Sequence, residues 1–142
     1  RDLSGNDFFA SKVYGDNAKE PSVVVLSFFA TWCVPCRLEV PQLEILSKAF
    51  PETQFYLVSV KDSEDKILKW LNDLKVELPV LVDKYGTTAK KFNVIGESES
   101  GQDVAILPAV FIINKDGTIV YQHTGYKPGD ELKLKKILEE LN

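Results

Sequence analysis

The sequence has few of the residues that small proteins use for cross-links or metal sites. Its 142 residues contain only two cysteines, Cys33 and Cys36, and one histidine. A disulfide-stabilised scaffold usually spreads several cysteine pairs along a short chain, and a structural zinc site needs four ligands. A bond between two cysteines so close together would close a very small loop and stabilise the fold by only about 2 kcal/mol. The pair therefore indicates a reactive site more than a structural one.

Long hydrophobic runs and methionine are also missing. No apolar run reaches 18 residues, the length typical of a membrane-spanning helix, and the longest, Val23 to Ala30, has the length of a strand. The formal net charge of −4 argues against a nucleic acid partner, since phosphate binding usually needs a basic surface. Without methionine, the chain is expected to begin after a processing event or an excision, which leaves open a signal peptide or membrane anchor before Arg1.

The hydrophobic pattern predicts a single α/β domain over residues 1–142. Strands are expected at Ser22–Ala30, Gln54–Val60, Pro79–Val82, Ala109–Ile113 and Thr118–His123, and helices at Ser4–Tyr14, after Cys36, after an N-cap at Ser63, at Lys84–Phe92 and at Pro128–Leu141. Ser22–Ala30 is apolar at nearly every position, as a central parallel strand requires. The predicted fold is a mixed sheet, with parallel strands first, an antiparallel hairpin at one edge and helices on both faces.

Cys33 directly follows the central strand and lies at the start of the next predicted helix. The free amides and positive end of a helix stabilise a thiolate and lower the pKa of a cysteine placed there. Pro35 fits the first turn, where its missing N–H costs nothing. Cys36 lies one turn further on the same face, so it can reach Cys33 and should be less exposed. We therefore predict that Cys33 is an exposed nucleophile that attacks partner disulfides and that Cys36 resolves the mixed disulfide.

Residues 28–37 (FFATWCVPCR) resemble the active-site segment of the thioredoxin superfamily. Together with Arg37–Pro41 and Leu107–Gly117, they are similar more narrowly to the TlpA/ResA-like (DsbE-like) branch of bacterial thiol–disulfide oxidoreductases. The resemblance covers nearly all of Ser22–Leu141. It implies a thioredoxin-like three-layer sandwich and an oxidoreductase that uses a redox-active disulfide, Cys33–Cys36, with no metal and no other cofactor.

The resemblance also implies where such a protein works and what it acts on. It implies an extracytoplasmic protein, in the bacterial periplasm or on the outer face of the membrane. Proteins of this branch are often membrane-tethered, and they mostly reduce specific partners such as apocytochrome c or copper-site assembly proteins. The expected partners are substrate proteins with disulfides or dithiols and an upstream membrane thiol reductant, and we expect a monomer. Val34 and Pro35, between the cysteines, leave the reduction potential and the direction of electron flow open.

Four further residues take their roles from the resemblance. Trp32 matches the tryptophan that shields the disulfide, Pro108 matches the cis-proline beside it, and the backbone of Leu107 is placed to pair with an extended substrate. Glu39 matches a glutamate that exchanges a proton with the second cysteine. Trp32, Pro35, Leu107 and Pro108 are thus expected to contact the substrate. The ordinary alternatives are a surface hydrophobe at Trp32, a proline starting an edge strand at Pro108 and a solvated carboxylate at Glu39.

Two features depart from the family pattern. Thioredoxin has a buried aspartate on its active-site strand, where this sequence has Ser27, and a hydroxyl cannot accept a proton as a carboxylate does. The expected proton acceptor is therefore Glu39. The stretch Val94–Ile106 is longer than usual before Pro108. We expect a solvated acidic loop there, with a groove for a partner as the alternative.

Two other functions are compatible with a thioredoxin-type fold. A Sco-like copper-binding chaperone would hold its metal through Cys33, Cys36 and His123, although those proteins space their cysteines more widely. The expected role of His123 is that of an ordinary strand histidine. Peroxiredoxins share the fold, but their reactive cysteine has no neighbour three residues further on. The sequence therefore favours thiol–disulfide exchange over both alternatives.

Overall fold

The computed structural model describes residues 22–97 and 103–142, so the helix predicted at Ser4–Tyr14 lies outside the described residues. In chain order the elements are β1 (Val24–Phe29), α1 (Val34–Ala49), β2 (Gln54–Val60), α2 (Glu64–Leu74), β3 (Val80–Asp83), α3 (Thr87–Lys91), β4 (Ile95–Glu97), β5 (Asp103–Ala105), β6 (Ala109–Ile113), β7 (Ile119–Thr124) and α4 (Asp130–Leu141). No helix in this part of the chain is long and apolar enough to cross a membrane.

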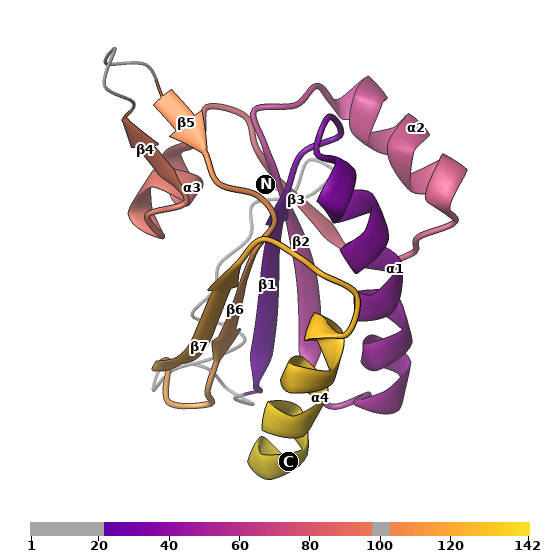
Figure 1. The fold of residues 1–142 in the computed structure, drawn as a ribbon, viewed down its shortest axis with the longest axis vertical. Helices are drawn as coiled ribbons and strands as arrows, with labels where there is room; N and C mark the ends of the chain where they lie inside the picture. The colour runs from indigo at the N-terminus through magenta and orange to yellow at the C-terminus, as the bar shows by residue number, and fades with distance from the viewer. Residues whose placement is uncertain (1–21, 98–102) are drawn as a thin grey trace.

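Five strands form a mixed sheet in the order β3-β2-β1-β6-β7 (Figure 1). β1 pairs in parallel with β2, and β2 with β3, whereas β6 runs antiparallel to both β1 and β7. All six residues of β1 are buried, because this strand has a neighbour on each side and apolar side chains on both faces. The predicted mixed sheet with parallel strands first and a hairpin at the edge is confirmed.

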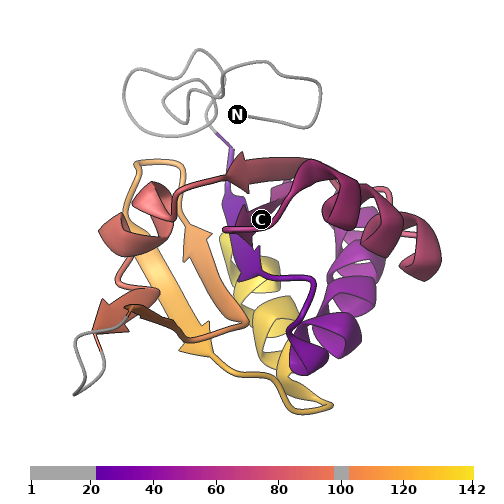
Figure 2. The same cartoon turned by 90° about the horizontal axis from the view of Figure 1, so that it is seen from above.

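The side chains of β1 alternate between two hydrophobic clusters. Val25 and Phe29 pack with α1, α2 and α4 on one face, and Leu26 and Phe28 pack with α3 on the other. Viewed from above, α1 and α2 lie together on one side of the molecule and α3 on the opposite side (Figure 2). The three-layer arrangement with helices on both faces is therefore confirmed.

A local sequence signal accounts for the start of α2, whereas the start of α4 differs from the prediction. Ser63 caps α2, since its Oγ accepts a hydrogen bond from the N–H of Lys66 at 3.3 Å, as predicted. The final helix begins later than expected, at Asp130. Its buried residues are Leu134 and Leu138. These leucines are four positions apart and lie on one face of the helix, against the sheet.

The polar stretch before Pro108 is the main departure from the predicted elements. β4 and β5 pair in antiparallel fashion, with Ile95 opposite Ala105. Val94 is buried, and Ala105 packs against the same cluster as Phe28. The expected solvated loop is therefore wrong for the two ends of Val94–Ile106. The apolar residues at these ends pack into the hydrophobic cluster under α3.

Candidate functional site

The two cysteines form a disulfide at the start of α1. Cys33 is the N-cap residue of the helix, and its Sγ accepts a hydrogen bond from the N–H of Cys36 at 3.3 Å. Pro35 lies in the first turn, where no intrahelical N–H is required. The segment leaves the carboxyl end of β1, at the edge where open α/β sheets gather their reaction sites. The predicted position of the pair, at a helix start after the central strand, is confirmed.

The expected exposure of Cys33 is wrong for the disulfide form. Cys33 is 5% exposed and Cys36 is fully buried. Only the prediction that Cys36 is the less exposed of the two cysteines is therefore confirmed. A turn closed by the N–H of Cys33 and the carbonyl of Ala30, at 3.1 Å, folds the first cysteine back onto the end of β1. The neighbouring side chains are open instead, with Trp32 63% and Val34 70% exposed. A partner would therefore meet an apolar surface with a small opening to sulfur.

Glu39 lies one turn after Cys36 and is 2% exposed. Its Oε1 accepts a hydrogen bond from the Oγ of Ser27 on β1 at 3.0 Å. Burial raises the pKa of Glu39 from 4.5 to about 7, and the bond from Ser27 opposes this rise only in part. The alternative of a solvated helix carboxylate is therefore wrong. Its carboxyl group can change protonation near neutral pH inside the core.

Acidic groups at the start of α4 add to the effect on Glu39. The charges of Asp130 and Glu131 raise its pKa further. Burial, and then the charges of Asp130 and Glu39, raise the pKa of Tyr121 on β7. Packing of α1 beside α4 thus places Glu39 in an acidic environment that favours its neutral form.

A second carboxylate near the disulfide was not anticipated from the sequence. Asp62 follows β2 and accepts two hydrogen bonds from Thr31, from the backbone N–H at 2.6 Å and from Oγ1 at 3.0 Å. These bonds tie the turn that precedes Cys33 to the neighbouring strand. The only signal in the sequence is that polar residues follow two adjacent parallel strands, whose carboxyl ends lie at the same edge of the sheet.

Leu107 and Pro108 approach the same end of β1 from the other side. The peptide bond between them is cis, and Pro108 is buried. Ala109 is paired with Phe28, so continuing the antiparallel register places Pro108 and Leu107 beside the last residues of β1. Leu107 packs against the cluster that contains both cysteines. The structure therefore brings this predicted pair to the end of β1 from which the cysteine segment leaves.

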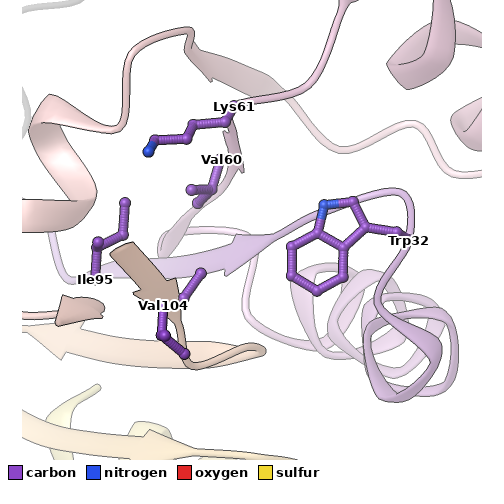
Figure 3. Close-up of a pocket in the computed structure, with 6 residues that line it drawn as sticks. Trp32, Val60, Lys61, Ile95 and Val104 are labelled. Atoms are coloured by element: carbon purple, nitrogen blue, oxygen red, sulfur yellow. The ribbon is translucent and has the colours of Figure 1, made fainter. Parts of the chain in front are cut away.

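Trp32 forms one wall of a cleft beside the disulfide. The cleft has a volume of about 420 Å³ and is lined by Trp32, Val60, Lys61, Ile95, Val104 and Ala105. Trp32 stands on one side of it, and Ile95 and Val104 stand on the other, on the β4 and β5 strands (Figure 3). The stretch before Pro108 thus contributes a wall of a mostly apolar cleft, as its alternative interpretation suggested.

His123 lies apart from the cysteines. Its Nε2 is 3.3 Å from the Oδ2 of Asp130. The described part of the chain contains no group of three or more histidine, cysteine, aspartate or glutamate residues that could hold a metal ion. The structure therefore does not bring Cys33, Cys36 and His123 together as the copper-chaperone alternative requires.

A profile of the AhpC/TSA family matches residues 2–122. The chain belongs to this family. It is 30% identical over 118 residues to the thiol-disulfide oxidoreductase ResA of Bacillus thuringiensis subsp. konkukian, which covers 80% of this chain and 62% of that protein. It is 29% identical over 122 residues to the thiol:disulfide interchange protein CycY of Rhizobium leguminosarum bv. viciae, covering 85% of this chain and 59% of CycY.

Solved structures agree with this assignment. A protein of Chlorobium tepidum, described as a thiol:disulfide interchange protein DsbE, superposes with a TM-score of 0.73 at 29% identity, over 85% of this chain and 81% of that one. The chain spans less than two thirds of the length of ResA and CycY. The resemblance to ResA-like and DsbE-like proteins and the thioredoxin-like fold are thus confirmed.

Proposed function

We propose that this member of the AhpC/TSA family is a thiol–disulfide oxidoreductase that exchanges electrons with disulfides or dithiols of partner proteins through Cys33 and Cys36. One observation carries the proposal: the two cysteines are joined at the start of α1, where the N–H of Cys36 points at the Sγ of Cys33. The same N–H would donate to a Cys33 thiolate and stabilise it. The names of ResA and CycY support the same activity.

The proposed exchange proceeds in two steps. The Cys33 thiolate attacks one sulfur of the partner disulfide, so that a mixed disulfide forms and the other partner sulfur leaves as a thiolate. The Cys36 thiolate then attacks the Sγ of Cys33, which forms the bond seen in the structure and releases the second partner thiolate. The partner gains two electrons and, after protonation of both sulfurs, two protons. The reverse sequence oxidises a partner dithiol.

Glu39 is the proposed proton acceptor for Cys36. The second step needs Cys36 as a thiolate, and this residue is completely buried from solvent. Glu39 is three residues further along the same helix and is itself buried, so the two side chains share one side of α1. Because its pKa is about 7, its carboxylate can accept a proton and release it again near neutral pH.

Substrate contact is assigned to the surface around the disulfide. Trp32 and Pro35 are exposed next to the cysteines, which suits contact with a docked polypeptide. Leu107 and Pro108 lie where β5 leads into β6, and the backbone of Leu107 would pair with an extended segment of the partner. Main-chain pairing of this kind holds the partner cysteine in register without demanding a particular side chain.

We further propose that the protein works as a reductant, in cytochrome c maturation or in the assembly of metal sites. It would act outside the cytoplasm, in the bacterial periplasm or at the outer face of the membrane, as a monomer that a membrane thiol reductant recharges. This finer assignment rests on the resemblance to the TlpA/ResA-like branch. No residue at the site sets the direction of electron flow, which depends on the reduction potential.

The test is a measurement of the Cys33–Cys36 potential together with trapping of intermediates. A thiol reagent should label Cys33 first in the reduced protein, and Cys36→Ala should accumulate mixed disulfides that Cys33→Ala cannot form. A potential well below about −180 mV would support a reductant. Preferential labelling of Cys36, or turnover that survives Cys33→Ala, would contradict the proposed mechanism.

A further inference from the structure

A second groove is lined by residues on both sides of the cysteine motif. It has a volume of about 230 Å³ and is lined by Thr31, Arg37, Lys66, Lys69, Trp70 and Asp73; we call it the basic groove. Thr31 comes two residues before Cys33, and Arg37 directly follows Cys36, so the groove borders the reactive pair at both ends of the motif. Its other four lining residues recur at helical spacing and lie on one face of α2.

The charges in the basic groove are not balanced within it. Three cationic side chains face one carboxylate, that of Asp73, in a protein whose net charge is −4. Within residues 22–97 and 103–142, Arg37, Lys66 and Lys69 form no ion pair, whereas Lys133 on α4 lies 3.8 Å from Asp130. The carboxylate of Asp62, which bonds the lining residue Thr31, accepts two hydrogen bonds from it. The groove is thus a local positive site on an acidic protein.

Trp70 connects the basic groove to the hydrophobic core. Trp70 is 3% exposed and stacks on Phe29 with ring centroids 4.7 Å apart, which joins the groove to the core beneath the disulfide. No acceptor for its Nε1–H exists among the described residues. Because the indole of Trp70 lines the groove, it should sense an anion that enters there. A carboxylate matches the three cations of the lining.

We propose that the basic groove binds carboxylate side chains of a partner protein, in the segment that flanks the partner's reacting cysteine. The proposal rests on the proposed function and adds a selection for acidic partners. A carboxylate seated between Arg37 and the lysines of α2 would hold the partner beside Cys33 during attack. Such contacts also raise the encounter rate, because exposed charges attract one another over a Debye length of about 10 Å at 0.1 M salt.

Two synthetic peptide disulfides provide the test, identical except for three glutamates or three glutamines beside the cysteine. Oxidation of the reduced protein is followed by tryptophan fluorescence. The glutamate peptide should react on the order of tenfold faster at about 10 mM ionic strength, and the ratio should approach one at about 0.5 M salt. Equal rates at low salt would overturn the proposal.

Matched lysine variants separate the groove from the net charge of the protein. Lys66→Gln with Lys69→Gln should abolish the preference for the glutamate peptide. Lys135→Gln with Lys136→Gln removes the same charge from exposed positions of α4 and should preserve the preference. A preference that survives the first pair of substitutions, or that both pairs abolish equally, would show that the groove is not the site.

A binding measurement keeps the test independent of redox chemistry. The same peptides with serine in place of cysteine are added to the oxidised protein, and the indole N–H signals are followed by NMR after assignment with Trp32→Phe. The Trp70 signal should shift when the glutamate peptide is added and should keep its position when the glutamine peptide is added. If neither peptide shifts the signal, the proposal is overturned. If the protein does not exchange with neutral hydroxyethyl disulfide, the proposed function is refuted. In that case the Trp70 signal by itself shows whether the basic groove binds carboxylates.

Discussion

Two buried carboxylates hold the segment that carries the disulfide, and they are bonded in different ways. Asp62 follows β2 and accepts two hydrogen bonds from Thr31, one of them from the backbone N–H. Glu39 lies on α1 and accepts a bond from the Ser27 hydroxyl. Both donors belong to the continuous stretch formed by β1 and the turn after it. Asp62 therefore faces a backbone amide as well as a hydroxyl, whereas the bond to Glu39 comes from a side-chain hydroxyl.

The difference shows how two acidic residues near one site can have separate roles. A backbone amide is a fixed donor, so Asp62, which accepts from the N–H of Thr31, is suited to anchor the turn before Cys33. A hydroxyl can also accept hydrogen bonds, so Ser27 can pair with Glu39 in either protonation state. Together with burial, which raises the pKa of Glu39 to about 7, this arrangement suits a group that gains and loses a proton.

The largest expected effect is on stability as a function of pH. Glu39 has a pKa of about 7 in the fold against an ordinary value of 4.5, and this difference corresponds to about 3 kcal/mol of folding free energy. Its contribution is fully present below pH 4.5 and is lost as pH rises through 7, because the folded state disfavours the charged form. Urea unfolding of the oxidised protein at several pH values should show this loss, and Glu39→Gln should remove it. Exposed Glu139→Gln is the control, and parallel curves for wild type and Glu39→Gln would contradict the assignment.

The second effect concerns the resolution step. Glu39→Gln should slow the attack of Cys36 on the mixed disulfide by about 100-fold near pH 7, since general base catalysis typically contributes at least that much. Rapid mixing with a peptide disulfide, followed by quenching and mass analysis, measures the decay of the mixed disulfide. The pH dependence near 7 should disappear with the variant. An unchanged decay rate of the mixed disulfide would show that Glu39 has a purely structural role.

A smaller effect is expected at the anchoring carboxylate. Asp62→Ala leaves the Thr31 N–H and hydroxyl without their acceptor and should lower the free energy of unfolding by about 2 kcal/mol. Asp73→Ala removes an exposed carboxylate and should cost less than about 0.5 kcal/mol. Urea unfolding at pH 5, where most Glu39 carboxyl groups remain protonated, separates the two contributions. Equal losses for both variants would remove the distinction between anchor and surface charge.

The smallest change should come from Ser27→Ala. Because the Ser27 bond lowers the pKa of Glu39, its loss should move that pKa further upward. Carboxyl carbon shifts in an NMR titration report the change. Ser59→Ala removes a buried strand hydroxyl of the same kind on β2, and it should leave the Glu39 titration in place. A Glu39 pKa that is the same in both variants would show that the Ser27 bond does not influence it.

Elements with strong local patterns were predictable from the sequence. β2 and β6 have the predicted bounds, Gln54–Val60 and Ala109–Ile113, because runs of β-branched and aromatic residues favour buried strands. The helix start at the cysteine pair follows from a central strand, a short turn and Pro35 in the first turn. These signals act over a few residues, so the position of the cysteine pair could be predicted.

Features that depend on distant parts of the chain were not predictable. β4 and β5 are too short for a periodic pattern, and they form because Ile95 and Ala105 pack against the cluster under α3. Leu132 was not distinguishable from Leu134 by hydrophobicity, yet only Leu134 faces the sheet. The burial of Cys33 likewise depends on how the turn before it folds onto β1.

By itself the sequence determined the position of a cysteine pair at a helix start, since the strand, the turn and the helical residues that create it are contiguous. Only the tertiary structure decided which carboxylate can exchange protons and which can anchor. Glu39 and Asp62 are both ordinary acidic residues in the sequence. Packing encloses Glu39 between β1, α1 and the acidic start of α4, and it brings Asp62 to the backbone of Thr31. Long-range packing sets the burial and the donors, and these two quantities control the charge of a carboxylate.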